Sequence, residues 1–158
     1  MKTPKIKVAT VSLAGCFGCH MSFLDMDERL VPLVEHIDIR RSPLTDIKTL
    51  EACDIGLIEG GLCNTENIET LHEFRKHCRI LVAVGACAIN GGVPAMRNAL
   101  EVGQCLTESY LNGLGVVSPQ IPDDPELPRL LPKVLPIHEE VVVDYFLPGC
   151  PPPADAFL

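Results

Sequence analysis

The sequence predicts an α/β fold with a mostly parallel, five-stranded sheet and helices on both of its faces. Short apolar runs alternate with segments of helical spacing, a pattern that implies right-handed crossovers between parallel strands. One of these runs, residues 79–84, is almost entirely apolar, as expected for a strand buried on both faces. The chain is long enough for one hydrophobic core, so we expect residues 1–158 to form a single domain.

The first third of the chain predicts two strands and two helices. Residues 6–13 are expected to form the first strand. A helix is predicted over 21–30, because its acidic residues lie in the early turns where the helix dipole favours them, and Pro32 limits where it ends. Residues 37–39 are predicted to form a short second strand, and a short helix is expected over 47–52.

The middle of the chain predicts a strand, a helix and a further strand. Residues 54–59 form the third predicted strand, closed by two glycines. Asn64 or Thr65 is expected to cap the next helix, because apolar residues follow at helical spacing. The fourth strand covers 79–84 and ends at Gly85-Ala86-Cys87.

The last third of the chain is rich in proline. A helix is predicted over 95–100, with Pro94 in its first turn, and another over 104–111. Residues 118–136 hold six prolines and predict an extended connection with room for one helical turn. The fifth strand is predicted over 140–147. A final helix begins at 154 and stops at once, so we expect the natural chain to continue.

Composition excludes several classes of function. A net charge of −8, an aromatic content of 4% and the absence of tryptophan argue against a nucleic-acid partner. Residues 1–5 lead into a strand without the apolar core of an export signal, which predicts a cytoplasmic protein with reduced thiols. No segment offers the roughly 18 uninterrupted apolar residues of a membrane helix, so an integral membrane protein is not expected. Eight cysteines in such a compartment favour metal binding or catalysis over disulfides.

Four cysteines are predicted to meet at one edge of the sheet. Cys16 and Cys19 follow the first strand, with glycines before and between them that let the backbone come close to a bound group. Cys87 follows the fourth strand, and Cys150 follows the fifth. Ligands of parallel sheets gather beyond the carboxyl ends of the strands. Four thiolates can hold an iron–sulfur cluster of the [4Fe–4S] type, and zinc is the alternative.

Other interpretations of these residues stay open. Cys16-x-x-Cys19-His20 matches the c-type haem attachment pattern, although that interpretation leaves Cys87 and Cys150 unused. Four buried structural cysteines without a metal are the simplest alternative.

Further polar and thiol side chains accompany these four. Glu59 ends the third strand, where a partly desolvated carboxyl would have a raised pKa and act as a proton relay, or would cap loop amides. Cys63 lies close enough in sequence to be a further ligand candidate. Arg97 is expected on an exposed face, as a solvated side chain or near the cluster. Three other cysteines, Cys53, Cys78 and Cys105, are expected in the core or in helices, with Cys78 on the apolar face of its helix.

Four motifs together carry a resemblance to a known family. They are Gly15-Cys16-x-x-Cys19, Glu59-Gly60-Gly61, Gly85-Ala86-Cys87-Ala88-x-x-Gly91-Gly92 and Pro148-Gly149-Cys150-Pro151-Pro152. As a set they resemble the small subunit of nickel–iron hydrogenases, whose core is shared with the cluster-carrying subunit of respiratory complex I. The segments 92–98 and 136–150 look most like the soluble NAD-reducing hydrogenases of the cytoplasm.

The resemblance implies a flavodoxin-like fold and an electron-transfer subunit. Its [4Fe–4S] ligands carry over as Cys16, Cys19, Cys87 and Cys150. The nickel–iron centre would belong to a large subunit, and electrons would pass to diaphorase subunits that carry FMN, further iron–sulfur clusters and NAD. No phosphate-cradling loop supports an FMN in this chain, because cysteines occupy the turn after the first strand.

Two departures narrow the resemblance. Membrane-bound and periplasmic hydrogenases have longer small subunits with more clusters and an export signal, and we expect neither feature in this sequence. Complex I relatives carry adjacent cysteines in the first motif, whereas two residues separate Cys16 from Cys19, which disfavours a quinone reductase. The remaining rivals are a sulfhydrogenase or coenzyme-reducing hydrogenase subunit and a zinc-stabilised docking scaffold.

Overall fold

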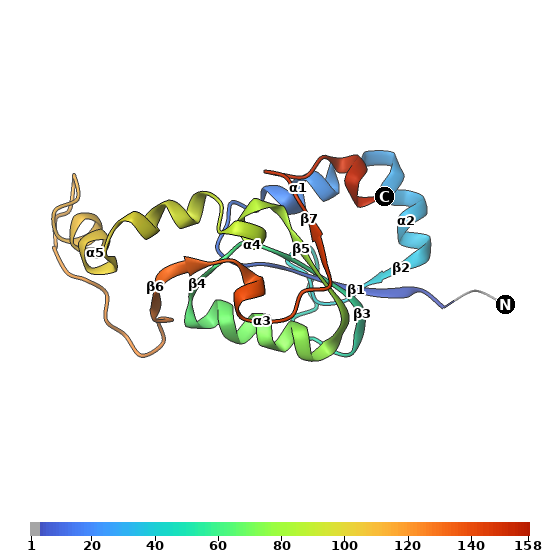
Figure 1. Cartoon of the computed structure of the whole chain (residues 1–158), viewed down its shortest axis with the longest axis horizontal. Coiled ribbons are helices and arrows are strands. Elements are labelled where there is room, and N and C mark those ends of the chain that lie inside the picture. Colours follow the sequence, from blue (N-terminus) through green and yellow to red (C-terminus); the bar gives the residue numbers. More distant parts are fainter. Residues whose placement is uncertain (1–3) are drawn as a thin grey trace.

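A computed structural model describes residues 4–158 and contains the predicted parallel sheet. The main sheet consists of β1 (Ile6–Ser12), β2 (Ile37–Ile39), β3 (Cys53–Glu59), β5 (Cys78–Val84) and β7 (Tyr145–Leu147). The strands lie in the order β2-β1-β3-β5-β7, and every neighbouring pair is parallel (Figure 1). This is the strand order of flavodoxin-like sheets, so the predicted fold class is confirmed.

The register places the carboxyl ends of the strands together. Ser12 of β1 is level with Glu59 of β3, and Glu59 is level with Val84 of β5. Val84 is in turn level with Leu147 of β7. The four loops that follow these strands therefore leave the sheet at the same edge.

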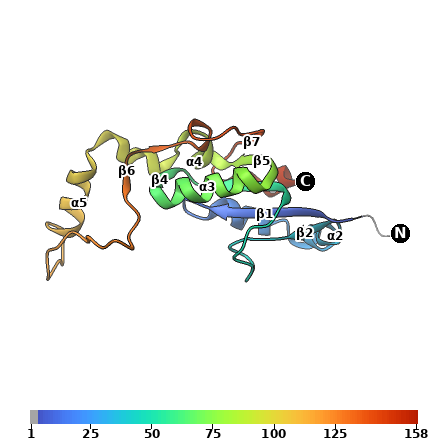
Figure 2. The same cartoon turned by 90° about the horizontal axis from the view of Figure 1, so that it is seen from below.

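Helices cover both faces of this sheet. The helices are α1 (Gly18–Leu24), α2 (Leu30–His36), α3 (Thr65–His77), α4 (Gly85–Asn90) and α5 (Val102–Tyr110). Four 3₁₀ segments accompany them: Asp27–Arg29, Val93–Ala99, Ile137–Glu139 and Ala154–Phe157. Figure 2 shows α3 on one side of β1 and α2 on the other. Asn64 caps α3, since its side-chain oxygen accepts a hydrogen bond of 2.8 Å from the Asn67 N–H, as predicted.

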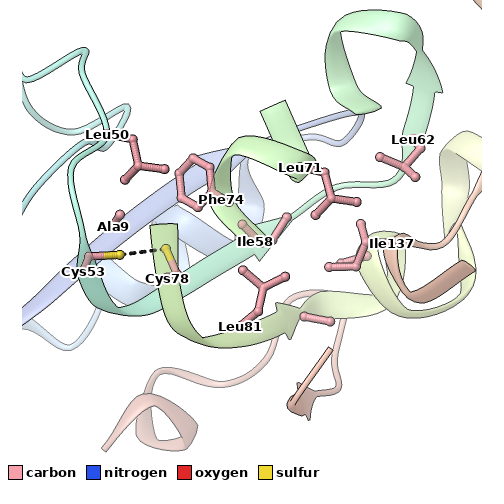
Figure 3. Close-up of a cluster of buried hydrophobic side chains, with 12 residues drawn as sticks. Ala9, Leu50, Cys53, Ile58, Leu62, Leu71, Phe74, Cys78, Leu81 and Ile137 are labelled. Atoms are coloured by element: carbon pink, nitrogen blue, oxygen red, sulfur yellow. Dashed lines mark hydrogen bonds between the residues drawn. The ribbon is translucent and has the colours of Figure 1, made fainter. Parts of the chain in front are cut away.

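The core lies between α3 and the sheet (Figure 3). Leu71 and Phe74 of α3 are fully buried, as are Ile58 of β3 and Leu81 of β5. Each such side chain contributes about 1.5–3 kcal/mol of transfer free energy on burial. Among residues 4–158, no helix has the length and apolar character needed to cross a membrane.

Two predictions for the first third of the chain are wrong. The helix expected over 21–30 is divided into α1 and α2, and Pro32 lies inside α2. Pro32 is the third residue of α2, where a backbone N–H has no partner within the helix, so proline is tolerated there. The helix expected over 47–52 is absent from the described residues, where this stretch is an irregular connection to β3.

The proline-rich region also differs from the prediction. The connection expected over 118–136 contains β6 (Leu130–Leu135), which pairs antiparallel with β4 (Leu62–Asn64). The helix expected over 95–100 is a 3₁₀ segment, and the strand expected over 140–147 is reduced to β7. In Figures 1 and 2, α5 and the chain after it project away from the main sheet.

Candidate metal centre

Reciprocal backbone hydrogen bonds join the cysteine loop after β1 to the loop after β3. The Ala14 N–H donates to the Gly61 oxygen at 3.0 Å, and the Gly61 N–H donates to the Ala14 oxygen at 2.8 Å. Gly60 has a φ of 85°, and a Cβ there would lie 2.7 Å from the Leu13 carbonyl carbon. Only glycine fits this close approach without strain, so the second motif fixes the position of the first.

Backbone amides that follow Cys16 contact its sulfur and the carboxylate of Glu59. Phe17 adopts a left-handed φ of 66° just before α1, and the Gly18 N–H donates to the Cys16 Sγ at 3.4 Å. The Cys19 and His20 N–H groups donate to Glu59 Oε2 at 2.9 and 3.3 Å. These two amides belong to the first turn of α1 and have no carbonyl partner within it. Glu59 therefore caps this turn, one of its two predicted roles.

The loop after β5 contacts both the Cys19 sulfur and the loop after β7. Gly85 has a φ of 80°, and a Cβ there would lie 2.4 Å from the Cys19 Sγ. The Ala86 N–H donates to the Gly149 oxygen at 2.8 Å, which joins the loop of Cys87 to that of Cys150. Cys87 itself lies in α4, although the sequence predicted a loop there.

The four thiols also interact electrostatically. Burial raises the pKa of Cys19 to about 12, and the charges of Glu59, Cys87 and Cys16 contribute to this rise. Burial likewise raises the pKa of Cys87, with contributions from the charges of Cys150 and Cys16, while the Val93 N–H lowers it. The structure therefore brings together Cys16, Cys19, Cys87 and Cys150, and ionising them side by side without a cation is unfavourable.

The chemistry of the donor atoms bears on the kind of metal group that fits. Among residues 4–158, no three His, Cys, Asp or Glu side chains are placed as ligands of a single ion would be. Four thiols at one edge of the sheet are a donor set that suits an iron–sulfur cluster, and four thiolates also suit zinc. The residues present thus fit a cluster, and Cys16 and Cys150 are exposed at its open side.

The prediction of a raised pKa for Glu59 is wrong. Burial does raise the pKa of this carboxyl, but interactions with the side chains of His20, Ser12 and Cys19 prevail and lower it. The His20 Nδ1 lies 2.9 Å from Glu59 Oε1, although neither atom meets the criteria for a hydrogen bond. We therefore treat the pair as a close electrostatic contact.

The haem-attachment interpretation of His20 is not supported. His20 is 6% exposed and stacks against Phe17 with ring centroids 4.6 Å apart. Its Nε2 lies 2.8 Å from Thr10 Oγ1, which in turn lies 2.7 Å from Ser42 Oγ. A ring held in this way is a packed helix residue and not a free haem ligand.

Other predicted residues lie apart from the four thiols. Cys63 belongs to β4. Burial raises its pKa, and the charge of Arg97 opposes this rise. Arg97 is half-buried and not solvated, which corrects the predicted exposed face. Cys53 and Cys78 are core residues as predicted, but Cys78 begins β5 instead of ending a helix. Cys105 lies in α5.

Sequence reasoning missed two contributors to this edge. Gly85 makes room for the Cys19 sulfur, and the backbone of Val93 lowers the pKa of Cys87. The sequence did place Gly85 in one of the four motifs, but it did not indicate that this glycine receives a sulfur. Val93 follows Gly91 and Gly92, both of which have positive φ.

The fold and this edge define the class: a doubly wound, parallel α/β protein that gathers four cysteines at the carboxyl ends of its strands. The family model described as "NADH ubiquinone oxidoreductase, 20 Kd subunit" matches residues 16–158, and the chain belongs to this family.

Particular relatives narrow the comparison. The chain is 56% identical over 158 residues to the delta subunit of the NAD-reducing hydrogenase HoxS of Cupriavidus necator, covering 98% of this chain and 76% of that subunit. It is 36% identical to one subunit of the F420-non-reducing hydrogenase of Methanothermobacter thermautotrophicus, and it spans only 50% of the length of that relative. A chain in a crystal structure of an NAD+-reducing [NiFe]-hydrogenase in the H2-reduced state superposes with a TM-score of 0.94 at 59% identity, covering 96% of this chain and 86% of that one. The [NiFeSe]-hydrogenase of Dm. baculatum, at 18% identity and a TM-score of 0.63, shares the fold.

Proposed function

We propose that this chain is the electron-transfer small subunit of a cytoplasmic NAD-reducing nickel–iron hydrogenase. In this role it relays electrons between a nickel–iron large subunit and diaphorase subunits that carry FMN, further iron–sulfur clusters and the NAD site. The observation that carries the proposal is the meeting of four cysteines, from loops after three different strands, at one edge of the sheet. The 56% identity to the delta subunit of HoxS supports the choice of complex.

Cys16, Cys19, Cys87 and Cys150 would hold one [4Fe–4S] cluster. When bound, such a cluster supplies one-electron redox chemistry at a potential set by hydrogen bonds to sulfur, charge and exclusion of water. Binding requires the thiols to lose their protons, so the positive iron would offset the burial that raises the pKa of Cys19 and Cys87.

The residues of this chain tune and shield the site. The Gly18 N–H donates to the Cys16 sulfur, and the backbone of Val93 lowers the pKa of Cys87, so both contributions stabilise negative charge on a proposed ligand. Glu59 holds the first turn of α1, so that Cys19 keeps its direction. The cavity beside Cys19, His20 and Phe157 measures about 20 Å³ and has room for a single water molecule.

Exposed apolar side chains border the site and suit a large, permanent interface. Met21 on α1 is 52% exposed, and Val93 and Met96 near Cys87 are 67% and 74% exposed. Apolar residues that remain this exposed beside a redox centre favour a covering subunit. We assign the nickel–iron large subunit to this surface, because electrons must reach the thiols over a short distance.

A coenzyme-reducing hydrogenase or sulfhydrogenase is the second candidate within the same class, supported by the 36% identity to the F420-non-reducing hydrogenase. The acceptor is chosen by partner subunits, so reduction of NAD or of another coenzyme by the purified complex separates the two. A zinc-stabilised docking scaffold is disfavoured by the match to the oxidoreductase family model and by the 56% identity to a hydrogenase subunit.

The test compares Cys19→Ser with Cys105→Ser in the assembled complex. Cys105 lies in α5 away from the four thiols and serves as the matched control. We expect Cys19→Ser to lose or change the electron paramagnetic resonance signal of this cluster and to abolish hydrogen-driven NAD reduction. The isotope exchange between hydrogen gas and deuterated solvent, which the nickel–iron site of the large subunit catalyses, should persist in both variants. Wild-type NAD reduction by Cys19→Ser would defeat the proposal.

A further inference from the structure

A second pair of thiols faces each other at the opposite end of the sheet. Cys53 and Cys78 are the first residues of β3 and β5 and are directly paired in the register. Their sulfurs lie 2.7 Å apart in the core, and the side chains are 7% and 3% exposed (Figure 3). The proposed cluster does not use either residue.

We propose that Cys53 and Cys78 form a reversible intrachain disulfide by exchange with an anionic, low-molecular-weight disulfide of the glutathione type. The Cys53 thiolate attacks one sulfur of the small disulfide, which forms a mixed disulfide and releases one small thiolate. The Cys78 thiolate then attacks the Cys53 sulfur and releases the second small thiolate. The two protons lost by the cysteines are taken up by the two released thiolates, so the small disulfide is reduced as the pair is oxidised.

The backbone geometry already suits the bond. Neighbouring strands lie about 4.7–4.9 Å apart, which is within the range of about 4.4–6.8 Å between the Cα atoms of bonded cysteines. A movement of about 0.7 Å would bring the two sulfurs from 2.7 Å to the bonding distance of about 2.05 Å. Gly56 provides the space for the Cys78 sulfur, because a Cβ at Gly56 would lie 2.8 Å from it.

The two cysteines lie between the core and an open cavity. The cavity measures about 440 Å³, and both residues contribute to its lining, although their side chains are only 7% and 3% exposed. Lys7, Lys76 and Arg79 line the same cavity, and Asp54 is its one carboxylate among the described lining residues. Three cations against one anion favour a negatively charged oxidant, such as oxidised glutathione with its free carboxylates.

The surroundings also indicate which sulfur reacts first. The hydrogen bond between the two thiols lowers the pKa of Cys53, as do the Ala9 backbone and the Lys7 charge, although burial and Asp54 oppose them. The pKa of Cys78 is raised by the same hydrogen bond and by burial. Cys53 is also the more exposed of the two residues, at 7% against 3%, and the cation Lys7 lines the same cavity. We therefore assign Cys53 as the attacking thiolate and Cys78 as the thiol that resolves the mixed disulfide.

The disulfide would tie together the strands that lead to the cluster edge. Residues 53 and 78 enclose β4 and α3, while the other ends of β3 and β5 carry Glu59 and Gly85. Closing this loop restricts the unfolded chain, so the oxidised protein should resist unfolding better than the reduced protein.

The test exposes the assembled complex, under anaerobic conditions, to oxidised glutathione alone. The protein is then unfolded in an alkylating reagent, digested and weighed. We expect a linked peptide pair containing Cys53 and Cys78, about 2 Da lighter than the two reduced peptides and separated by dithiothreitol. The Cys105→Ser control should give the same linked pair. Alkylation of both residues, or glutathione left on either in the wild type, would overturn the proposal.

A second pair of variants tests the order of attack. In Cys78→Ala the resolving thiol is absent, so Cys53 should retain one glutathione. In Cys53→Ala we expect Cys78 to remain unmodified, because its side chain is only 3% exposed and burial, which also raises its pKa, persists without Cys53. Glutathione found on Cys78 and not on Cys53 across these two variants would contradict the assigned order.

Discussion

The Cys19 sulfur packs against Gly85, and a Cβ added to Gly85 would lie only 2.4 Å from the Cys19 Sγ. This contact joins the loop after β1 to the loop after β5, two segments that lie far apart in the sequence. It also explains why the end of β5 requires a residue without a side chain, since the φ of Gly85 is 80°.

Gly85→Ala should therefore disturb the thiol edge. The added methyl group collides with a proposed ligand, and the left-handed φ strains any residue with a Cβ, at a cost of about 1–3 kcal/mol. We expect a lower melting temperature and lower iron content in the purified complex. Gly103→Ala is the control, because a Cβ at Gly103 meets nothing within 4 Å and alanine favours its helix. Equal iron content in the two variants would contradict this account of Gly85.

Phe74 anchors α3 to the sheet and is fully buried. Phe74→Ala should lower the free energy of unfolding by about 3–5 kcal/mol, through lost burial and the cavity left behind. The free energies are measured by urea denaturation of the full chain. Val142→Ala, at a site 77% exposed, should change stability little. Similar losses in both variants would mean that α3 does not depend on this contact.

Asp144 links α3 to β5 and predicts a dependence of stability on pH. Arg75 donates to its Oδ2 at 2.7 Å, as does the Leu81 N–H at 2.7 Å, and both hydrogen bonds lower the pKa of Asp144. A lowered pKa in the folded state stabilises the protein above the unfolded pKa of about 3.9, and this stability is lost as the pH falls through the folded pKa.

Asp144→Asn should accordingly have a lower urea midpoint than the wild type at pH 7. In acid the difference between the two midpoints should shrink, because the wild type loses the stabilising charge. The effect should be modest, because the Asp144 side chain is 36% exposed and solvent screens the pair. Asp123→Asn, on the exposed proline-rich connection, is the control. A deficit in Asp144→Asn that stays constant from pH 7 to acid would show that charge is not the cause.

The projecting segment around α5 predicts a contact with a partner subunit. Leu114 and Val117 lie just after α5 and are almost completely exposed. The double variant Leu114→Ser/Val117→Ser should weaken co-purification of partner subunits while leaving the iron content of this chain unchanged. Val31→Ser on α2, which is 67% exposed, is the matched control. Normal assembly of the double variant would assign these residues no role in binding.

Prediction from the sequence succeeded where local pattern and chain direction suffice. The strands β1, β3 and β5 were found within one or two residues, because apolar runs of this length have few alternatives. The cap at Asn64 was also found, since its side chain and the helix it caps are adjacent in sequence. The grouping of the cysteine loops at one edge followed from the parallel order of the strands.

Prediction failed where a distant partner decides the outcome. β6 forms because β4 offers a free edge, and its Pro132 gave no local sign of a strand. The raised pKa expected for Glu59 considered burial alone, whereas the side chains of His20 and Cys19, which belong to another element, lower it.

The sequence by itself determined the parallel α/β architecture and the edge at which Cys16, Cys19, Cys87 and Cys150 are placed, because hydrophobic periodicity and strand polarity are local properties of the chain. Only the tertiary structure decided that Gly85 receives the Cys19 sulfur, that Glu59 caps α1, and that Cys53 meets Cys78 across two strands. Each of these contacts joins residues far apart in the chain, and their separation is set by strand register and packing, which no local pattern encodes.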